Sequence, residues 1–486
     1  MISFNSIPID LRTPGAYVEF DSSRAQQGLP TRTPRVLLIG PRLAAGTVAA
    51  NELRRLTGKE SAAAWYGAGS ILAHMAKAFF NAYRYAEVWA YDLSDAGGGV
   101  AATKTITLSG PATAAGTLAA YVAGRKVQVA VAAADTANTI ATALAAAINA
   151  NTDIPATAGA AAAVVTVTAK NKGTPGIGID VRVNHNPEDR LPAGVTVVIA
   201  EGVAGSGDPD FTAAIAAIGD QPFDAIVTAY TDTTSLNLLK TELESRWGPM
   251  RQLDGLVFAA KRDTYGNLAS FGAARNGKFE TVLGYRGPNP PWEWAAAYAA
   301  VVMQAAGQDP ARPFQTLQLP GLLAPKVNER FTRAERELLL ADGISTFVVD
   351  QGGAVLLERP ITTYQSDANG EPDTSWLDVN TPLTLSYLRW SLRLRFTQRY
   401  PRHKLANDGT HFGEGQAVIT PKVARAELVS LFREWEAAGL VENIDQFVAD
   451  LKVERDQSNP NQLNALIPPD LVNQLRVFAA QIQFRL

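Results

Sequence analysis

Continuous apolar runs and helical periodicities alternate along much of the chain. The first apolar run, residues 35–40, precedes a long helical pattern over residues 61–83 and a second apolar run at 87–92. Short uninterrupted apolar runs are typical of strands buried on both faces. This part of the sequence therefore predicts a β-α-β unit.

The same alternation of helix and strand resumes after residue 210. The pattern predicts helices over residues 211–218, 234–247 and 292–306, and strands over residues 223–230, 255–260, 279–285, 344–350 and 354–358. Such alternation favours a largely parallel sheet covered by helices. We therefore expect an α/β core built from two separate stretches of sequence.

Between these stretches, residues 95–208 are rich in Ala, Thr, Val and Gly and poor in charge. Glycine-rich segments at 96–99 and 202–208 bracket this region, and we interpret them as hinges. Inside it the patterns predict a helix over 135–149 and strands over 103–108, 125–131, 164–169 and 195–199. We expect an inserted α+β domain that faces outward.

The last third of the chain changes character again. A charged amphipathic run at 383–399 is followed by a polar loop at 401–415 and by a second helical pattern at 421–438. Thr420 suits the N-cap of that helix, and apolar residues recur at i, i+3, i+4 and i+7: Leu428, Leu431, Phe432 and Trp435. These elements predict a third, α+β domain.

Both ends of the chain carry period-two alternation beside prolines. Near the start it covers residues 16–20, and at the end Phe478, Ala480, Ile482, Phe484 and Leu486 share one face of a predicted strand. A one-sided terminal strand requires a partner sheet. We therefore expect extended arms at both ends. The resulting domain limits are an arm at 1–34, a core of 35–94 with 209–365, an insertion at 95–208, a C-terminal domain at 366–470 and an arm at 471–486.

Composition restricts the functions that are open to this chain. Lys and Arg total 44 against 47 Asp and Glu, so the net charge of -3 provides no general attraction to nucleic acid or anionic lipid. The absence of cysteine excludes disulfides, thiolate metal sites and a cysteine nucleophile. The N-terminus lacks the pattern of a targeting peptide, and the longest apolar stretch, 294–307, is too short to span a bilayer.

Candidate chemistry is sparse. No glycine-rich phosphate-binding motif follows the first strand, and Gly67 and Gly69 fall inside the predicted helix 61–83. The four histidines, His74, His185, His403 and His411, fall in three regions and accompany no nucleophile elbow or metal-ligand spacing. We therefore expect no catalytic residues, no cofactor and no metal.

Four segments carry a family resemblance: IPIDLRTPGAYVEF at 7–20, FDAIVTAY at 223–230, GISTF at 343–347 with ERPITTY at 358–364, and VNQLRVFAAQIQFRL at 472–486. In this order, with an insertion after the second strand, the chain resembles the tail sheath proteins of contractile phages, in their Mu-like branch. The resemblance implies a subtilisin-like α/β core without a catalytic triad.

The resemblance also implies a structural function. Sheath subunits form hexameric rings that stack helically around an inner tube and contract to drive the tube through a cell envelope. The implied partners are further copies of the chain, the tail tube, the baseplate and the tail terminator, with no nucleic acid and no membrane insertion. The implied location is the virion tail, after assembly in the host cytoplasm.

Two sets of site residues follow from these expectations. We expect the interface arms to act through Tyr17, Val18, Glu19, Phe20, Phe478, Ile482, Phe484 and Leu486. We expect the capped helix at 421–438 to face the tube through Lys422, Arg425, Arg433, Glu434 and Glu436. The alternatives are an α/β hydrolase or nucleotide-binding enzyme, and a surface adhesin that carries the insertion as its module.

Overall fold

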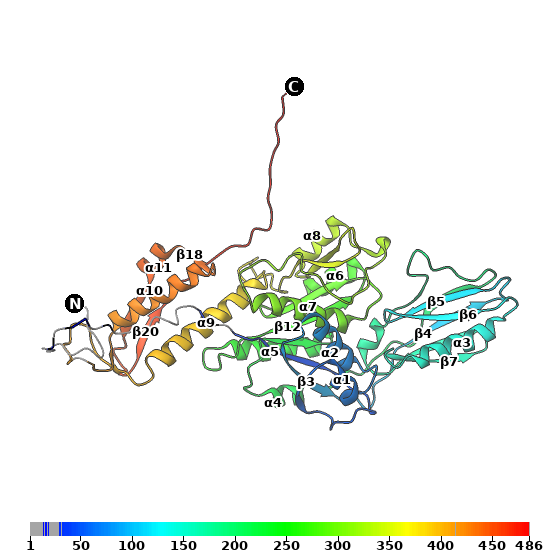
Figure 1. The fold of residues 1–486 in the computed structure, drawn as a ribbon, viewed down its shortest axis with the longest axis horizontal. Helices are drawn as coiled ribbons and strands as arrows, with labels where there is room; N and C mark the ends of the chain where they lie inside the picture. The colour runs from blue at the N-terminus through cyan, green and yellow to red at the C-terminus, as the bar shows by residue number, and fades with distance from the viewer. Residues whose placement is uncertain are drawn as a thin grey trace. The chain divides into compact units, whose positions relative to one another are not determined.

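The computed structural model describes residues 13, 15, 16, 18, 29, 30, 32–413 and 415–485. The described chain folds into two compact units (Figure 1). The larger unit contains residues 32–387 and the end of the chain from Asn473, and the smaller contains residues 388–472.

The larger unit is built on a six-stranded sheet in the order β13-β12-β11-β1-β3-β2. All neighbouring pairs are parallel except β2 with β3. The strands are β1 (Arg35–Pro41), β2 (Leu53–Leu56), β3 (Glu87–Leu93), β11 (Ala225–Thr228), β12 (Leu256–Arg262) and β13 (Glu280–Tyr285). The expected α/β core with a largely parallel sheet is therefore present, built from two separate stretches of sequence.

Helices cover this sheet. They include α1 (Lys59–Tyr66), α2 (Ile71–Ala82), α4 (Thr212–Ile218), α5 (Thr233–Trp247), α6 (Tyr265–Ala273) and α7 (Pro291–Ala306). Helix α7 is buried without interruption from Trp292 to Met303, because its alanines leave room for α2 and the sheet to approach closely. It is the central helix of the core (Figure 1).

The single helix predicted over residues 61–83 is wrong. Gly67 and Gly69 adopt φ of 89° and 79°, a left-handed conformation that ends α1 and that other residues rarely tolerate. Ser70 then starts α2 by accepting a hydrogen bond from the backbone N–H of Ala73 at 3.1 Å. The glycines are thus a turn between two helices rather than part of one.

The strands predicted at 344–350 and 354–358 do not join the parallel sheet. They form an antiparallel hairpin of β14 (Thr346–Val349) and β15 (Val355–Arg359), joined to β13 only by a bridge between Leu283 and Ser345. A connection of five residues is too short for the crossover that a parallel pair requires. Helix α8 (Arg333–Ala341), with a Thr332 and Glu335 capping box, precedes the hairpin.

The insertion contains two antiparallel sheets, the α-helix α3 (Ala137–Ala150) and the 3-10 helix η1 (Thr174–Gly178). One sheet has the order β10-β4-β8-β7 and the other β6-β5-β9. Their strands are β4 (Thr103–Ser109), β5 (Gly116–Val122), β6 (Arg125–Val131), β7 (Ala156–Ala161), β8 (Val164–Ala169), β9 (Val181–Val183) and β10 (Thr196–Glu201). The Asn149 amide on α3 exchanges two hydrogen bonds with the backbone of Ala158 on the outer edge of β7, at 2.7 and 2.8 Å.

Helix α9 (Asn380–Arg399) begins in the larger unit and ends in the smaller. Within the smaller unit, the end of α9 packs against α10 (Pro421–Ala437). There the Trp435 indole N–H donates to the Ser391 hydroxyl at 3.0 Å. Thr420 caps α10 by accepting from the Val423 N–H, as predicted. The remaining elements are β16 (Lys404–Leu405), β17 (Val418–Ile419), β18 (Val441–Glu442), α11 (Ile444–Asp450), β19 (Lys452–Arg455), β20 (Leu463–Leu466) and β21 (Asp470–Leu471). None of the described helices is long and apolar enough to cross a membrane.

Candidate assembly surfaces

The C-terminal arm exposes a row of large apolar side chains. Phe478, Ile482 and Phe484 are 85%, 89% and 81% exposed, and no helix or strand is assigned from Val472 to Arg485. The alternation predicted for this segment places these three side chains on one face of an extended chain. Such a face is stable in water only when another surface covers it.

The arm begins directly after a fixed point. Arg476 donates to a carboxylate oxygen of Asp378 at 3.1 Å and to the side-chain oxygen of Asn380 at 3.0 Å. Asp378 also holds Arg359 through two contacts of 3.0 Å. The position of Arg476 is therefore set by the larger unit, and the exposed residues follow it.

Most of the predicted N-terminal arm lies outside the described residues. This applies to Tyr17, Glu19 and Phe20, and to Leu486 at the other end of the chain. Val18 is described and is 78% exposed. Its role in an interface stays a prediction.

The hairpin of β19 and β20 has open edges. The two strands pair only with each other among the described residues, and α10 packs against β19. No residue of either strand is buried, and Leu466 at the end of β20 is 61% exposed. Each strand has one row of backbone N–H and C=O groups that another strand could pair with.

The five predicted tube-facing residues on α10 differ in their surroundings. Lys422 and Arg433 are exposed and Glu436 is half-buried. Arg425 instead donates to the carbonyl of Val448, and Glu434 forms an ion pair with Arg395. Arg425 and Glu434 therefore already have partners within the same unit.

The glycine-rich segments that bracket the insertion form a tightly bonded neck. Asp95 accepts from the backbone N–H of Lys172 at 3.0 Å, and Asp208 accepts from the N–H and hydroxyl of Thr174 at 2.7 Å each. Burial raises the pKa of both carboxyl groups above the usual value. A Cβ on Gly205 would lie 2.1 Å from the carbonyl oxygen of Gly173, so this glycine allows close packing of two segments.

Asn171 joins this neck to the core. Its side chain is 1% exposed, donates to the carbonyl of Arg42 at 2.7 Å and accepts from the N–H of Ile71 at 3.2 Å. The same amide donates to Asp95 at 3.2 Å. One buried side chain thus connects the loop after β1, the start of α2 and the first segment of the neck.

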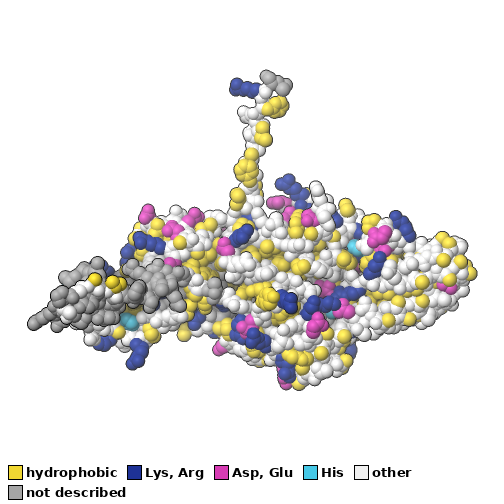
Figure 2. Space-filling view, in the orientation of Figure 1, with side chains coloured by type: hydrophobic (Ala, Val, Ile, Leu, Met, Phe, Trp, Pro, Cys, Tyr) yellow, Lys and Arg dark blue, Asp and Glu magenta, His cyan; other side chains and the backbone are white. Residues whose placement is uncertain are grey.

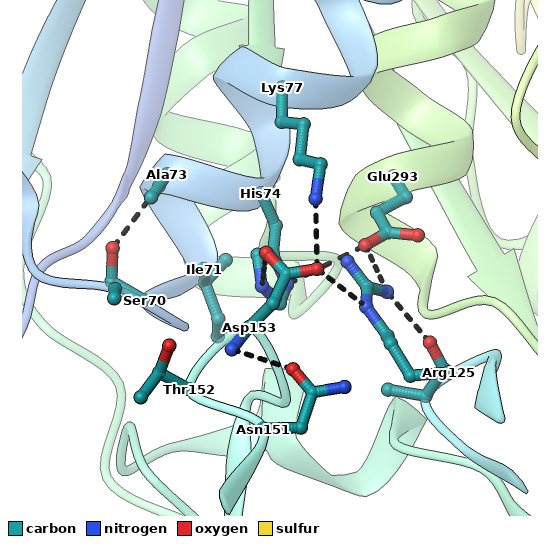
Figure 3. A network of polar contacts seen from close by, with 12 residues as sticks. Ser70, Ile71, Ala73, His74, Lys77, Arg125, Asn151, Thr152, Asp153 and Glu293 are labelled. Atoms are coloured by element: carbon teal, nitrogen blue, oxygen red, sulfur yellow. Dashed lines mark hydrogen bonds and ion pairs between the residues drawn. The ribbon is translucent and has the colours of Figure 1, made fainter. Parts of the chain in front are cut away.

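A cluster of charged side chains forms a second connection between insertion and core (Figure 3). Arg125 on β6 lies 2.5 Å from Glu293 on α7 and 3.3 Å from Asp153, which precedes β7. Lys77 on α2 lies 2.9 Å from Asp153. Two cations and two anions, drawn from both parts of the chain, therefore neutralise one another.

His74 lies inside this cluster and is 1% exposed. Its ring nitrogens are 3.5 Å from Glu293 and 3.7 Å from Asp153, too far for good hydrogen bonds. Burial, reinforced by the Arg125 guanidinium, holds the pKa of His74 well below its usual value. The ring is therefore neutral near pH 7.

A third connection between insertion and core involves the segment before β9. Asp180, before β9, forms ion pairs with Arg262 at the end of β12 and with Arg182. Arg182 also reaches Glu329 at 2.8 Å. These contacts, the neck and the cluster around His74 hold the insertion against the core at several separated points.

The described histidines lie in separate parts of the chain. His185 lies beside Arg182 and Tyr121 in the insertion, whereas His403 packs on Tyr400 in the smaller unit. A cleft of about 530 Å³ opens at the carboxyl ends of β11 and β12, where α/β enzymes bind ligands, but no histidine or serine is among its described lining residues. In the described part of the chain no three His, Asp or Glu side chains form a metal-binding group.

The loop after β1 is occupied by an arginine side chain of its own. The Arg42 side chain fills it by donating to the carbonyl of Gly46 at 2.8 Å and pairing with buried Asp92 at 3.2 Å. A cation already neutralised by a buried carboxylate is a poor anion site.

Comparison with known proteins identifies the family. The model of the phage tail sheath protein central domain matches residues 204–363, and that of the phage tail sheath C-terminal domain matches residues 371–485. The chain is 43% identical over 484 residues to the Mu-like prophage FluMu tail sheath protein of Haemophilus influenzae, covering 99% of both proteins.

Solved structures share the fold at low sequence identity. A sheath tail protein from Desulfitobacterium hafniense matches with a TM-score of 0.50 and 13% identity, over 95% of this chain and 97% of that one. The anti-feeding prophage baseplate in its contracted state contains a chain that matches with a TM-score of 0.51 and 11% identity, over 98% and 99%. The family models and the relative of equal length together place this chain in the phage tail sheath family, in its Mu-like branch.

Proposed function

We propose that the chain is the subunit of a contractile tail sheath that polymerises as stacked hexameric rings around an inner tube and contracts to drive the tube through a cell envelope. The observation that carries this proposal is the 43% identity over nearly the full length of a Mu-like tail sheath protein. The similarity to chains in contracted assemblies supports the contractile part of the proposal.

The arms are the proposed links between subunits. The arm and the hairpin of β19 and β20 could complete each other. The arm exposes an apolar row, Phe478, Ile482 and Phe484, that lacks a covering surface, and the hairpin lacks neighbouring strands. A two-stranded hairpin is marginal by itself, so an added strand stabilises it. We assign β19 and β20 as the acceptor of an arm from a neighbouring copy.

The proposed partners besides further copies are the tail tube, the baseplate and the tail terminator, and the proposed site is the virion tail after assembly in the host cytoplasm. Exposed Lys422 and Arg433 on α10 are the best candidates for the tube-facing contacts. An exposed pair contributes roughly 0 to 1 kcal/mol, which becomes substantial only when repeated over many subunits.

In the proposed sheath, free energy is stored in the packing of subunits against one another. The chain turns over no substrate. Contraction then proceeds from a metastable arrangement of subunits to a more stable one. The neutral His74, whose neighbouring charged side chains pair with one another, and the cleft without histidine or serine support a chain without catalysis. The subtilisin-like assignment of the core and the domain limits at 34, 94, 208, 365 and 470 remain predictions.

Negative-stain microscopy of the purified full chain tests the proposal. We expect hollow striated cylinders, with or without added tube protein. A chain that stays monomeric at high concentration and with tube protein present would contradict the proposal, and so would saturable hydrolysis of a nucleotide or peptide.

A further inference from the structure

The root of the C-terminal arm, residues 473–477, restricts where the next copy can lie. We propose that the β19-β20 hairpin of a neighbouring copy docks beside the point at which Arg476 fixes the arm, on the larger unit. Subunits then contact each other at this anchor as well as along the arm. The inference rests on the proposed sheath function and on the arm as the link between copies.

Two polar side chains fix the root on the larger unit. Gln474 donates to the carbonyl of Ala311 at 3.4 Å. Arg476, two residues further on, donates to the side chains of Asp378 and Asn380 as described above. The Asn380 side chain is itself fully buried, so this anchor belongs to the body of the larger unit. The free length of the arm therefore begins only beyond Arg476.

The exposed side of the root is apolar. Leu475, between the two anchoring residues, is 72% exposed, and Val477, directly after them, is 79% exposed. Phe478 begins the apolar row on the other face of the extended chain. Figure 2 shows hydrophobic side chains along the arm. Because both faces are apolar here, the surface that covers the arm in the polymer must reach the anchor itself.

The short distance from the anchor to the apolar row sets the position of the acceptor. Phe478 is two residues from Arg476, so their Cα atoms are at most about 7 Å apart. A strand that pairs with the arm at Phe478 lies about 5 Å from it. The acceptor strand therefore passes within about 12 Å of the Arg476 backbone. A link with one intervening residue does not allow a more distant acceptor.

The β19-β20 hairpin is suited to this place. In the part of the chain that the structure describes, its two strands pair only with each other, so either edge can accept the arm. Leu466, at the end of β20, is 61% exposed and offers an apolar surface to the root. The hairpin belongs to the smaller unit and the anchor to the larger, so the two surfaces differ. Such a heterologous contact propagates into rings or helical filaments.

Cross-linking between copies tests this position, because the chain has no cysteine of its own. One variant carries Asn473→Cys, which is exposed in the root, and a second carries Leu466→Cys at one end of the hairpin. A third carries Asn461→Cys, exposed in the turn at the other end, because the hairpin can run in either direction. Cylinders grown from the first variant mixed with the second or the third, and treated with a short bismaleimide, should give covalent dimers in at least one mixture. No variant alone should give them.

The control replaces Asn473→Cys by Gln128→Cys, an exposed position on β6 in the insertion. It should give no dimers with either hairpin variant. Cylinders without dimers from both Asn473→Cys mixtures, or equal dimers from the control, would overturn the inference. So would a cross-link found only within single chains when both substitutions are placed in one chain, because the arm would then lie on its own hairpin.

Release of the anchor provides a second measurement. Gln474→Ala/Arg476→Ala leaves Asp378 paired with Arg359, so the monomer should keep its unfolding midpoint. The free linker before Phe478 grows from one residue to about five, and effective concentration falls roughly as the −3/2 power of linker length. The subunit concentration needed for cylinders should therefore rise roughly tenfold. An unchanged concentration would contradict the anchor. If the unsubstituted chain forms no cylinders, the proposed function itself fails, which is a different result from cylinders without these cross-links.

Discussion

The insertion and the C-terminal arm differ in how well their sequences indicate their attachment to the core. The insertion enters and leaves the core through glycine-rich segments, yet Asn171, Arg125 and Asp180 bond it firmly to the core. The arm follows the firmly bonded Arg476, and its apolar side chains are exposed. Glycine content alone therefore does not indicate a hinge. Whether such a segment can bend depends on the hydrogen bonds and ion pairs of its backbone and of the nearby side chains.

Removal of the arm should have the largest effect. A chain that ends at Arg476 should be a folded monomer with an unchanged free energy of unfolding, because the deleted side chains are exposed, but it should form no cylinders. Chemical denaturation and negative-stain microscopy give the two readouts. Cylinders like those of the full chain would remove the arm from the assembly.

The apolar row should account for most of that loss. Phe478→Ser/Ile482→Ser/Phe484→Ser should abolish cylinders, since each side chain contributes roughly 1.5 to 3 kcal/mol when buried. The matched control Gln481→Ala/Gln483→Ala, on the opposite face of the predicted strand, should assemble normally. If the triple serine variant assembled and the glutamine variant did not, polar contacts rather than the apolar row would hold the arm.

On the insertion side, Arg125→Ala should lower the free energy of unfolding by about 3 to 5 kcal/mol, because it leaves Glu293 buried without its cation. Arg54→Ala, which breaks the exposed pair with Glu52, should cost less than about 1 kcal/mol. Guanidinium titrations measure both variants. Equal small losses would show that the insertion is only loosely attached.

Acidification should weaken the same connection. The pKa of His74 is lower in the folded chain than in the unfolded chain, so the unfolded chain binds the extra proton. The stability that this group contributes is complete above about pH 6.5 and falls by up to about 1.4 kcal/mol per pH unit below it. Arg125, Lys77, Asp153 and Glu293 face the ring.

His74→Gln should therefore flatten the dependence of the melting temperature on pH between 5 and 7. The exposed His411→Gln is the control for the loss of a histidine. An unchanged slope in His74→Gln would assign the acid sensitivity to other groups.

The smallest effect is expected on α10. Lys422→Glu/Arg433→Glu should weaken assembly on tubes by a few-fold and spare tube-free polymers, because both residues are exposed. Arg425→Glu is a less clean test, since Arg425 also bonds Val448. Unchanged co-assembly with tubes would exclude this face of α10 from the tube interface.

Local patterns predicted the elements better than their pairing. The strands at 125–131 and 164–169 and the capped helix α10 were predicted almost to the residue, because apolar periodicity and capping residues act locally. The break at Gly67 was missed because both flanking helices share one apolar pattern. The pairing of β14 with β15 was missed because alternation along the chain does not specify sheet order.

The connections between insertion and core could not be predicted. Arg125 and Glu293 are far apart in sequence, and neither stands in a motif. Asn171 looks like an ordinary polar loop residue until its three partners are known. Contacts of this kind depend on the tertiary arrangement, which a single sequence does not encode in any local pattern.

The Asn149 amide has a consequence for the pool of free subunits during synthesis. The edge strand β7 has no charge and no proline, so its outward backbone groups would be a template for aggregation in a crowded cell. By occupying both backbone groups of Ala158, Asn149 closes the middle of this edge. New chains can then accumulate at high concentration without precipitating, until ordered growth consumes them.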